Sequence, residues 1–183
     1  KSEYLTALHN HTLPVLLNTE KVEKGDCFFI PAGTVHAICK GCYIAEIQQT
    51  SDITYRIYDY DRRDKNGNPR ELHTELATDV INFCEQKQHS IHYHQHENHT
   101  EELVSCNYFT TNYLKFDKEV EKDYIELDSF VIYMCLEGNF TLVYDVDKTV
   151  KVNKGETILV PAILKNLFLI PETEAEILEI YIR

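Results

Sequence analysis

A short segment occurs twice in this chain, and the repeat restricts the possible folds more than any other feature. Residues 22–38 read VEKGDCFFIPAGTVHAI, and residues 152–168 read VNKGETILVPAILKNLF. Both copies have a Lys-Gly pair, an acidic residue, an apolar run and then a Pro-Ala pair. Such a repeat indicates a β unit present in two copies. Asn166 of the second copy stands where the first has His36, so we predict one copy that bears a site and one that serves as a scaffold.

The first copy has the pattern G-x5-P-x-G-x2-H at Gly25, Pro31, Gly33 and His36. Proline ends a strand because it cannot donate to the ladder, and glycine permits the positive φ that a reversal needs. His36 would then begin the returning strand and point into a barrel, where a neutral imidazole is a good metal ligand. A lone histidine packed in a β core is the alternative, but the spacing favours a site. The pattern resembles the second conserved motif of the cupin superfamily.

The remaining sequence has mostly strand-like patterns with a short helical insert. Apolar spacing predicts a helix near residues 3–17, in two pieces if Pro14 breaks it, and another over residues 70–84. Short strands are expected again from residue 102 to the end. Four more strands are expected between the helices, at 26–30, 35–39, 43–49 and 54–60.

A polar, histidine-rich stretch separates the two β regions. It contains five histidines in the run HSIHYHQHENH: His89, His92, His94, His96 and His99. The run has no acidic or cysteine companions at a fixed ligand spacing, so we expect a linker without a physiological metal. The predicted domains are therefore residues 1–88 and 89–183.

Composition excludes several classes of function. The formal net charge of −12 argues against nucleic acid and anionic membrane surfaces, because both need a basic face. No apolar run is long enough for a transmembrane helix. Most of the six cysteines lie in strand-like runs, which suits reduced thiols in a cytoplasmic protein. The CKGC run at 39–42 is interpreted as a hairpin turn with two incidental thiols.

Residues 45–73, AEIQQTSDITYRIYDYDRRDKNGNPRELH, closely resemble the type I mannose-6-phosphate isomerases in their shorter bacterial form. In that family a glutamate, a Gln/Asn-x-Ser-Asp turn and an arginine follow the metal-binding histidine. Here Glu46, residues 49–52 and Arg56 follow His36 in the same order. The segments ELHTELATDVINF, NYFTTNYLKF, LEGNFTLVY and VNKGETILVPA resemble later parts of the family. The resemblance covers the whole chain and identifies it as the C-terminal part of such an enzyme.

The resemblance implies a mostly β fold with two cupin-type jelly-roll units, the first N-terminally incomplete and the second metal-free. It also implies zinc-dependent interconversion of mannose 6-phosphate and fructose 6-phosphate, with a small phosphorylated sugar as substrate. His36 would be a zinc ligand, and Arg56 would stabilise the enediolate oxygen. Glu46 and Asp52 would contact the substrate. The family's other zinc ligands lie in its N-terminal part, which is missing here, so this chain alone is expected to be inactive.

Two other interpretations remain open. The chain could belong to another metal-dependent cupin enzyme, such as a dioxygenase, or to a sugar-binding or structural module without catalysis. Arg56 would then be a sheet arginine paired with an acid, Asp52 would cap its turn, and Glu46 would pair with a neighbour. The sequence identifies neither the proton-transfer residue nor the oligomeric state.

Overall fold

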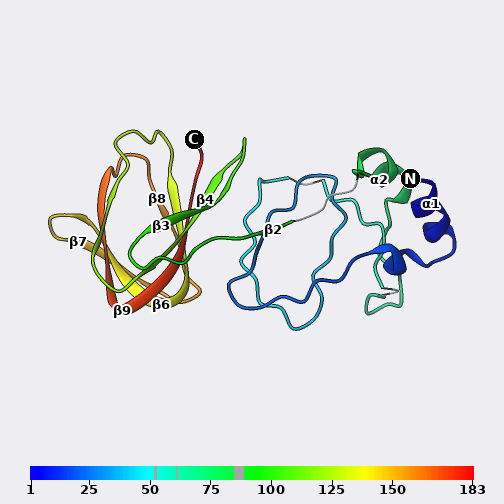
Figure 1. Ribbon diagram of the computed structural model, residues 1–183, viewed down its shortest axis with the longest axis horizontal. Coiled ribbons are helices and arrows are strands. Elements are labelled where there is room, and N and C mark those ends of the chain that lie inside the picture. Colours follow the sequence, from blue (N-terminus) through cyan, green and yellow to red (C-terminus); the bar gives the residue numbers. More distant parts are fainter. Residues whose placement is uncertain (52, 61, 85–88) are drawn as a thin grey trace. The chain divides into compact units, whose positions relative to one another are not determined.

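A computed structural model of the protein describes residues 1–51, 53–60, 62–84 and 89–183. The chain divides into two compact units, Lys1–Ser90 (unit 1) and Ile91–Arg183 (unit 2) (Figure 1). None of the helices that these residues form is long and apolar enough to cross a membrane.

Unit 2 is built from antiparallel strands that belong to one hydrogen-bonded sheet. The strand order is β3-β4-β9-β6-β7, with β5 also paired to β9 and β8 also paired to β6. The strands are β3 (Thr100–Ser105), β4 (Thr110–Phe116), β5 (Val120–Asp123), β6 (Val131–Asp145), β7 (Lys148–Asn153), β8 (Thr157–Val160) and β9 (Asn166–Tyr181).

Two of these strands, β6 and β9, are long enough to take part in two layers. Residues 175–181 of β9 pair with β4, whereas residues 166–169 pair with β5. Residues 131–134 of β6 pair with β8, and its later part pairs with β7. Register shifts around Gly138 mark bulges that bend β6 between these parts. Two layers, β3-β4-β9-β6-β8 and β5-β9-β6-β7, thus share the long strands, which is a jelly-roll arrangement.

The core of unit 2 lies between these layers. Phe116, Tyr133 and Phe140 are 0%, 0% and 1% exposed. The ring of Phe140 meets Phe116 at 5.9 Å and Tyr133 at 6.3 Å between centroids, both edge to face. Burial of one large apolar side chain contributes about 1.5–3 kcal/mol. Because alternate residues of β6 are buried, a shift of one residue would expose this core, so packing fixes the register.

Unit 1 has little regular structure. It contains α1 (Ser2–His9), the 3-10 helix η1 (Leu13–Leu16) and α2 (Thr74–Val80). The short strands β1 (Cys27–Phe28) and β2 (Ser90–Ile91) pair with each other. The helices lie where helical spacing was recognised, and their buried side chains include Tyr4, Ala7 and Ala77.

Most of the strands predicted for unit 1 are wrong for this chain. Residues 35–39, 43–49 and 54–60 contain no assigned strand, and only Cys27–Phe28 of the run at 26–30 is one. These runs have strand-like composition, but a strand exists only through hydrogen bonds to a neighbouring backbone. Within the described part of the chain, no neighbouring backbone forms such a ladder with them.

The turns of the repeated segment are the same in both copies. In the first copy, the Asp26 amide donates to the Glu23 carbonyl at 3.2 Å, and the Glu23 amide donates to the Asp26 carboxylate at 2.8 Å. In the second copy, Glu156 and Asn153 make the same two bonds at 3.0 Å and 2.7 Å. The equivalence predicted from the repeat is therefore confirmed at this turn.

The Pro-Ala corner also recurs. The Thr34 amide donates to the Pro31 carbonyl at 3.2 Å, and the Leu164 amide donates to the Pro161 carbonyl at 3.0 Å. After the corner the copies diverge, because the second enters the long strand β9 and the first forms no ladder. Asn166, the counterpart of the histidine, is exposed at the start of β9.

Candidate functional site

His36 lies directly after the Pro-Ala corner of unit 1. Its Nδ1 is 3.0 Å from the carbonyl oxygen of Thr34. Because a carbonyl only accepts, Nδ1 carries the proton and donates, which leaves the Nε2 lone pair available to a metal or a substrate. The side chain is exposed, so the expected enclosure of His36 in a barrel is not present in this chain.

Gly33 fixes the corner that carries this histidine. Its φ is +84°, as predicted for the reversal. The glycine also packs closely against the end of α2: its carbonyl accepts from the Asn82 amide at 2.9 Å. A Cβ at position 33 would lie 2.6 Å from the Val80 carbonyl oxygen. The motif glycine therefore serves two purposes, a left-handed turn and a close contact with a helix, and the sequence indicated only the first.

Gly33→Ala should destabilise this corner more than Gly41→Ala, and the matched pair separates the two purposes. Both glycines have positive φ, but a Cβ at position 41 meets nothing within 4 Å. The left-handed conformation alone should cost about 1–2 kcal/mol in each variant. The clash in Gly33→Ala should add about 1–3 kcal/mol. Hydrogen exchange of the Asn82 amide measures the difference, and equal protection in both variants would contradict the packing argument.

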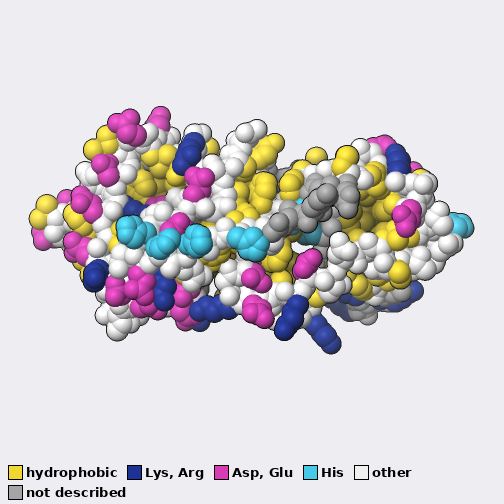
Figure 2. Space-filling view, in the orientation of Figure 1, with side chains coloured by type: hydrophobic (Ala, Val, Ile, Leu, Met, Phe, Trp, Pro, Cys, Tyr) yellow, Lys and Arg dark blue, Asp and Glu magenta, His cyan; other side chains and the backbone are white. Residues whose placement is uncertain are grey.

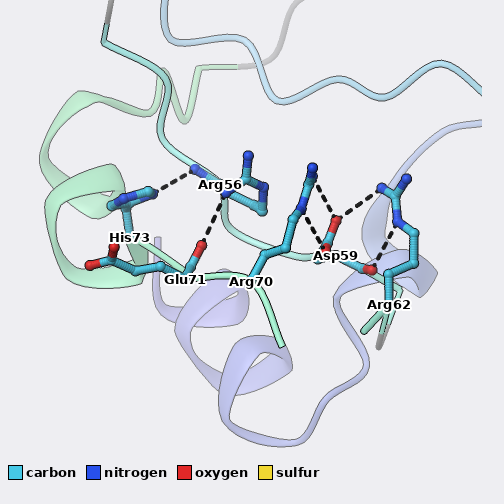
Figure 3. Close-up of polar contacts among 6 residues, drawn as sticks. All are labelled: Arg56, Asp59, Arg62, Arg70, Glu71 and His73. Carbon is cyan, nitrogen blue, oxygen red and sulfur yellow. Dashed lines mark hydrogen bonds and ion pairs between the residues drawn. The ribbon is translucent and has the colours of Figure 1, made fainter. Parts of the chain in front are cut away.

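Arg56 is held by two residues near the start of α2 (Figure 3). The His73 amide donates to the Arg56 carbonyl at 2.7 Å, and the Arg56 amide donates to His73 Nδ1 at 3.1 Å. One guanidinium nitrogen donates to the Glu71 carbonyl at 3.2 Å. The side chain is half-buried. Backbone and guanidinium are thus both anchored, and among the described residues only the Glu71 carbonyl accepts a hydrogen bond from the guanidinium.

A buried carboxylate, Asp59, lies near Arg56 and joins two further arginines. The Arg70 guanidinium donates two hydrogen bonds to this carboxylate in a bidentate arrangement, with both N···O distances at 3.0 Å. Arg62 approaches to 2.9 Å. Burial raises the pKa of Asp59, but the bond from Arg70 and the charges of all three arginines outweigh burial, so this pKa is below its ordinary value. The carboxylate therefore stays ionised in the neutral range.

The sequence alone did not indicate this network. Asp59 lies in the strand-like run TYRIYDY, and its partners Arg62 and Arg70 follow it by three and eleven positions. The available signal was the hairpin turn DKNGNP, which returns the chain so that Arg63 and Pro69 pair as an isolated bridge. That hairpin brings Arg70 back beside Asp59.

The structure gives less information on the two other predicted site residues, Glu46 and Asp52. Glu46 is exposed. Asp52 lies outside the described residues. The structure therefore brings together Arg56 with the Asp59 network, and within the described ranges no hydrogen bond or ion pair joins either of them to His36 or Glu46. The hollow lined by Ser2, Glu3, Thr6, Ala7, Thr12 and Leu16 contains none of these candidates.

The described residues do not form a complete metal site. Among them, no three His, Cys, Asp or Glu side chains come together in a way that could hold an ion. His36 suits the role of a single ligand, because Thr34 fixes its tautomer and leaves Nε2 available. One imidazole cannot supply the three or four ligands of a zinc site.

No family model matches the chain. Its sequence is 35% identical over 163 residues to the mannose-6-phosphate isomerase ManA of Bacillus subtilis, covering 88% of this chain and 51% of that protein. It is 53% identical over 66 residues to the mannose-6-phosphate isomerase of Streptococcus mutans, covering 36% of this chain and 21% of that protein. The crystal structure of the B. subtilis mannose 6-phosphate isomerase superposes with a TM-score of 0.87 at 32% identity, over 99% of this chain and 57% of that one. The chain spans about half the length of the curated relatives that it matches over most of its own length.

Proposed function

We propose that this chain, which belongs to the mannose-6-phosphate isomerase family, forms part of a site that interconverts mannose 6-phosphate and fructose 6-phosphate. The observation that carries the proposal is the match to a solved isomerase over 99% of this chain with a TM-score of 0.87. Unit 1 would be the C-terminal part of the catalytic cupin domain, and unit 2 would be the second, metal-free jelly roll. The remaining zinc ligands would come from polypeptide outside this chain.

Arg56 is the residue that we assign to the chemistry. Aldose–ketose isomerisation moves a proton between the first two carbons and develops negative charge on a sugar oxygen. A fixed cation aimed at that oxygen stabilises the transition state more than the ground state. The backbone bonds to His73 and the bond to the Glu71 carbonyl support this role, because they hold the guanidinium in place before substrate arrives.

The charge around Arg56 also suits an anionic substrate. Three guanidinium groups, those of Arg56, Arg62 and Arg70, surround the single carboxylate of Asp59. Counted over the described residues, the cluster is therefore locally cationic, although the whole chain has a net charge of −12. Such a patch attracts a sugar phosphate, whereas the acidic remainder of the surface repels it. Glu46 and Asp52 would bind sugar hydroxyls or move protons.

His36 would be one zinc ligand through Nε2, with its Nδ1 proton bonded to Thr34. Because the other ligands are not among the described residues, we derive no step through the metal. The six cysteines are all free thiols, and this favours a reducing compartment, so we place the protein in the cytoplasm.

His36→Ala should leave the zinc content of this 183-residue chain unchanged after extensive dialysis. A lone imidazole binds zinc too weakly to retain it. Elemental analysis of wild-type and variant samples, prepared side by side, measures the difference. One zinc per chain in the wild type that is lost in His36→Ala would show that further ligands around this histidine exist in the chain itself.

The function is tested on a longer protein that carries this chain together with a segment corresponding to the rest of the relatives' length, called here the extended protein. With zinc supplied, it should convert mannose 6-phosphate to fructose 6-phosphate in a coupled assay, and the 183-residue chain alone should not. Tight binding of the sugar phosphate without conversion would favour the non-catalytic sugar-binding module instead. A bound iron with oxygenase turnover would favour another metal-dependent cupin enzyme.

A further inference from the structure

A surface of unit 2 carries histidines that the proposed function does not use. Figure 2 shows histidine side chains in a row across this unit. Alternating positions in the segment before β3 provide exposed imidazoles at residues 92, 94 and 96. The intervening Tyr93 instead packs against Tyr113, with ring centroids 5.4 Å apart. The aromatic contact anchors the segment to β4 and leaves the histidines on the outer side.

Two of these imidazoles are spaced for chelation. The ring centroids of His94 and His96 are 5.7 Å apart. An ion bound 2.0–2.1 Å from one nitrogen of each ring would be about 3.2 Å from each centroid. For ligand angles between a right angle and a tetrahedral one, the centroids would then be about 4.5–5.2 Å apart. The observed spacing exceeds this by about half an ångström, which a small rotation about each side chain removes.

A carboxylate fixes the second imidazole. His96 Nδ1 is 2.6 Å from Oε1 of Glu101. An ionised carboxylate only accepts, so Nδ1–H donates and Nε2 keeps its lone pair. The His96 side chain is 63% exposed, so its ring is open to solvent. The side chain of Glu101, which orients this ring, is 27% exposed and therefore partly buried. Metal-binding histidines have this arrangement, in which the carboxylate orients the ring and increases its basicity.

We propose that His94 and His96, oriented by Glu101, form a chelating site for a divalent cation on unit 2. Imidazole ligands favour borderline ions such as Ni²⁺, Cu²⁺ and Zn²⁺ over Mg²⁺ or Ca²⁺. Two imidazoles supply the protein ligands, and water completes the coordination. The residues of this site belong to unit 2, whereas His36 and Arg56 belong to unit 1. The net charge of −12 further favours a cation.

This proposal differs from the expectation of a linker without a physiological metal. The sequence showed five histidines without an acidic companion at a recognised spacing. In the structure the turn at residues 96–99, closed by a 3.4 Å bond from the His99 amide to the His96 carbonyl, brings Glu101 back to His96. Asn98 has a φ of +61° within this turn. The acidic partner of His96 is therefore Glu101, which the turn and the first residues of β3 place beside the ring.

The test is a titration of the 183-residue chain with Ni²⁺. The exposed thiols of Cys39, Cys42 and Cys84 would compete for the ion, so the chain carries Cys39→Ser, Cys42→Ser and Cys84→Ser throughout. Calorimetry should find one Ni²⁺ site, and paramagnetic broadening in NMR spectra should act first on the imidazole signals of His94 and His96. His94→Asn and His96→Asn should each weaken binding by at least about tenfold, and Glu101→Gln by about 10–100-fold.

His99→Asn is the matched control. This histidine is also exposed and lies in the same turn, but the proposal gives it no role, so its replacement should leave the affinity unchanged. All four side chains are at least partly exposed, and circular dichroism should show an intact sheet in every variant. Equal broadening of all histidine signals, or a Ni²⁺ affinity that His94→Asn and His96→Asn do not change, would overturn the proposal. Either result would show adventitious binding only.

Discussion

Arg56→Ala in the extended protein should reduce the kcat of isomerisation by about 10²–10³, because it removes a fixed electrostatic partner of the developing oxyanion. The loss should appear in kcat more than in KM, since the interaction strengthens only as charge forms on the sugar oxygen. Arg56→Lys should restore little activity, because an ammonium does not reproduce the guanidinium fork. Steady-state kinetics with mannose 6-phosphate measures all three effects.

Arg63→Ala is the control for this experiment. Arg63 lies in the neighbouring hairpin, where its guanidinium donates to the Gly67 carbonyl at 3.0 Å, and it is exposed. Its removal changes the net charge by the same amount as the removal of Arg56, so kcat should be unchanged. If Arg56→Ala folds normally and keeps activity within about threefold of the wild type, Arg56 is a structural residue rather than a catalytic one.

Lys122→Met should destabilise unit 2 by about 3–5 kcal/mol, because it leaves a buried carboxylate without its counterion. Glu179 on β9 is 2% exposed, and Lys122 on β5 is 8% exposed. Their charged atoms are 3.0 Å apart. Glu179 also accepts from Asn112 at 2.8 Å and from the hydroxyl of Tyr124, which in turn contacts the Tyr133 hydroxyl. Native-state hydrogen exchange of the β9 amides measures the free energy of unfolding.

Lys151→Met provides the comparison. Lys151 and Glu172 form an ion pair with a shorter N···O distance of 2.6 Å, but both side chains are more than half exposed, at 52% and 61%. Such a pair contributes about 0–1 kcal/mol. We therefore predict a larger loss of stability for Lys122→Met than for Lys151→Met, because the Lys122 pair is buried, although its N···O distance is longer. A Lys122→Met variant no less stable than Lys151→Met would show that the network around Glu179 tolerates an unpaired charge.

The same network gives a pH dependence with a defined sign. Burial raises the pKa of Glu179, but the charge of Lys122 and the bonds from Asn112 and Tyr124 outweigh it, so this pKa lies below the ordinary 4.5. A carboxylate with a lowered pKa stabilises the fold fully above its unfolded pKa and loses that contribution as the pH falls through the folded value. Without Lys122, burial dominates and the pKa rises. The stability difference between wild type and Lys122→Met should therefore shrink as the pH falls, first through the raised pKa of the variant and then, below 4.5, through the lowered pKa of the wild type.

The parts of the fold that depend on local chemistry could be predicted from the sequence. Turn residues fix their own hydrogen bonds, and the equivalent turns at Asp26 and Glu156 follow from the repeated Lys-Gly-acid pattern. The mostly β fold is confirmed, and so is the relation to mannose-6-phosphate isomerases. The positive φ of Gly33 also follows from its place in the motif.

Features that depend on distant neighbours could not be predicted. The runs at 35–39 and 43–49 have strand composition, yet they form no ladder, because a strand needs a partner that composition does not reveal. Asp59 also lies in a run with strand composition. Its role as the partner of Arg70 depends on the hairpin that brings Arg70 beside it, and the sequence does not show this contact. The buried pair of Lys122 and Glu179 joins strands that are far apart in the sequence. Neither segment has a sequence pattern that indicates its partner.

If unit 1 provides residues of an aldose–ketose isomerase site, the extended protein should depend on His36 for both its zinc and its turnover. Zinc content and the rate of conversion of mannose 6-phosphate to fructose 6-phosphate should be determined on the same samples of wild type and His36→Ala. We expect the wild type to hold zinc and convert the sugar, and the variant to lose both while its sheet remains folded. A variant that keeps its zinc and its turnover, or a zinc-loaded wild type that does not convert the sugar, would contradict the claim.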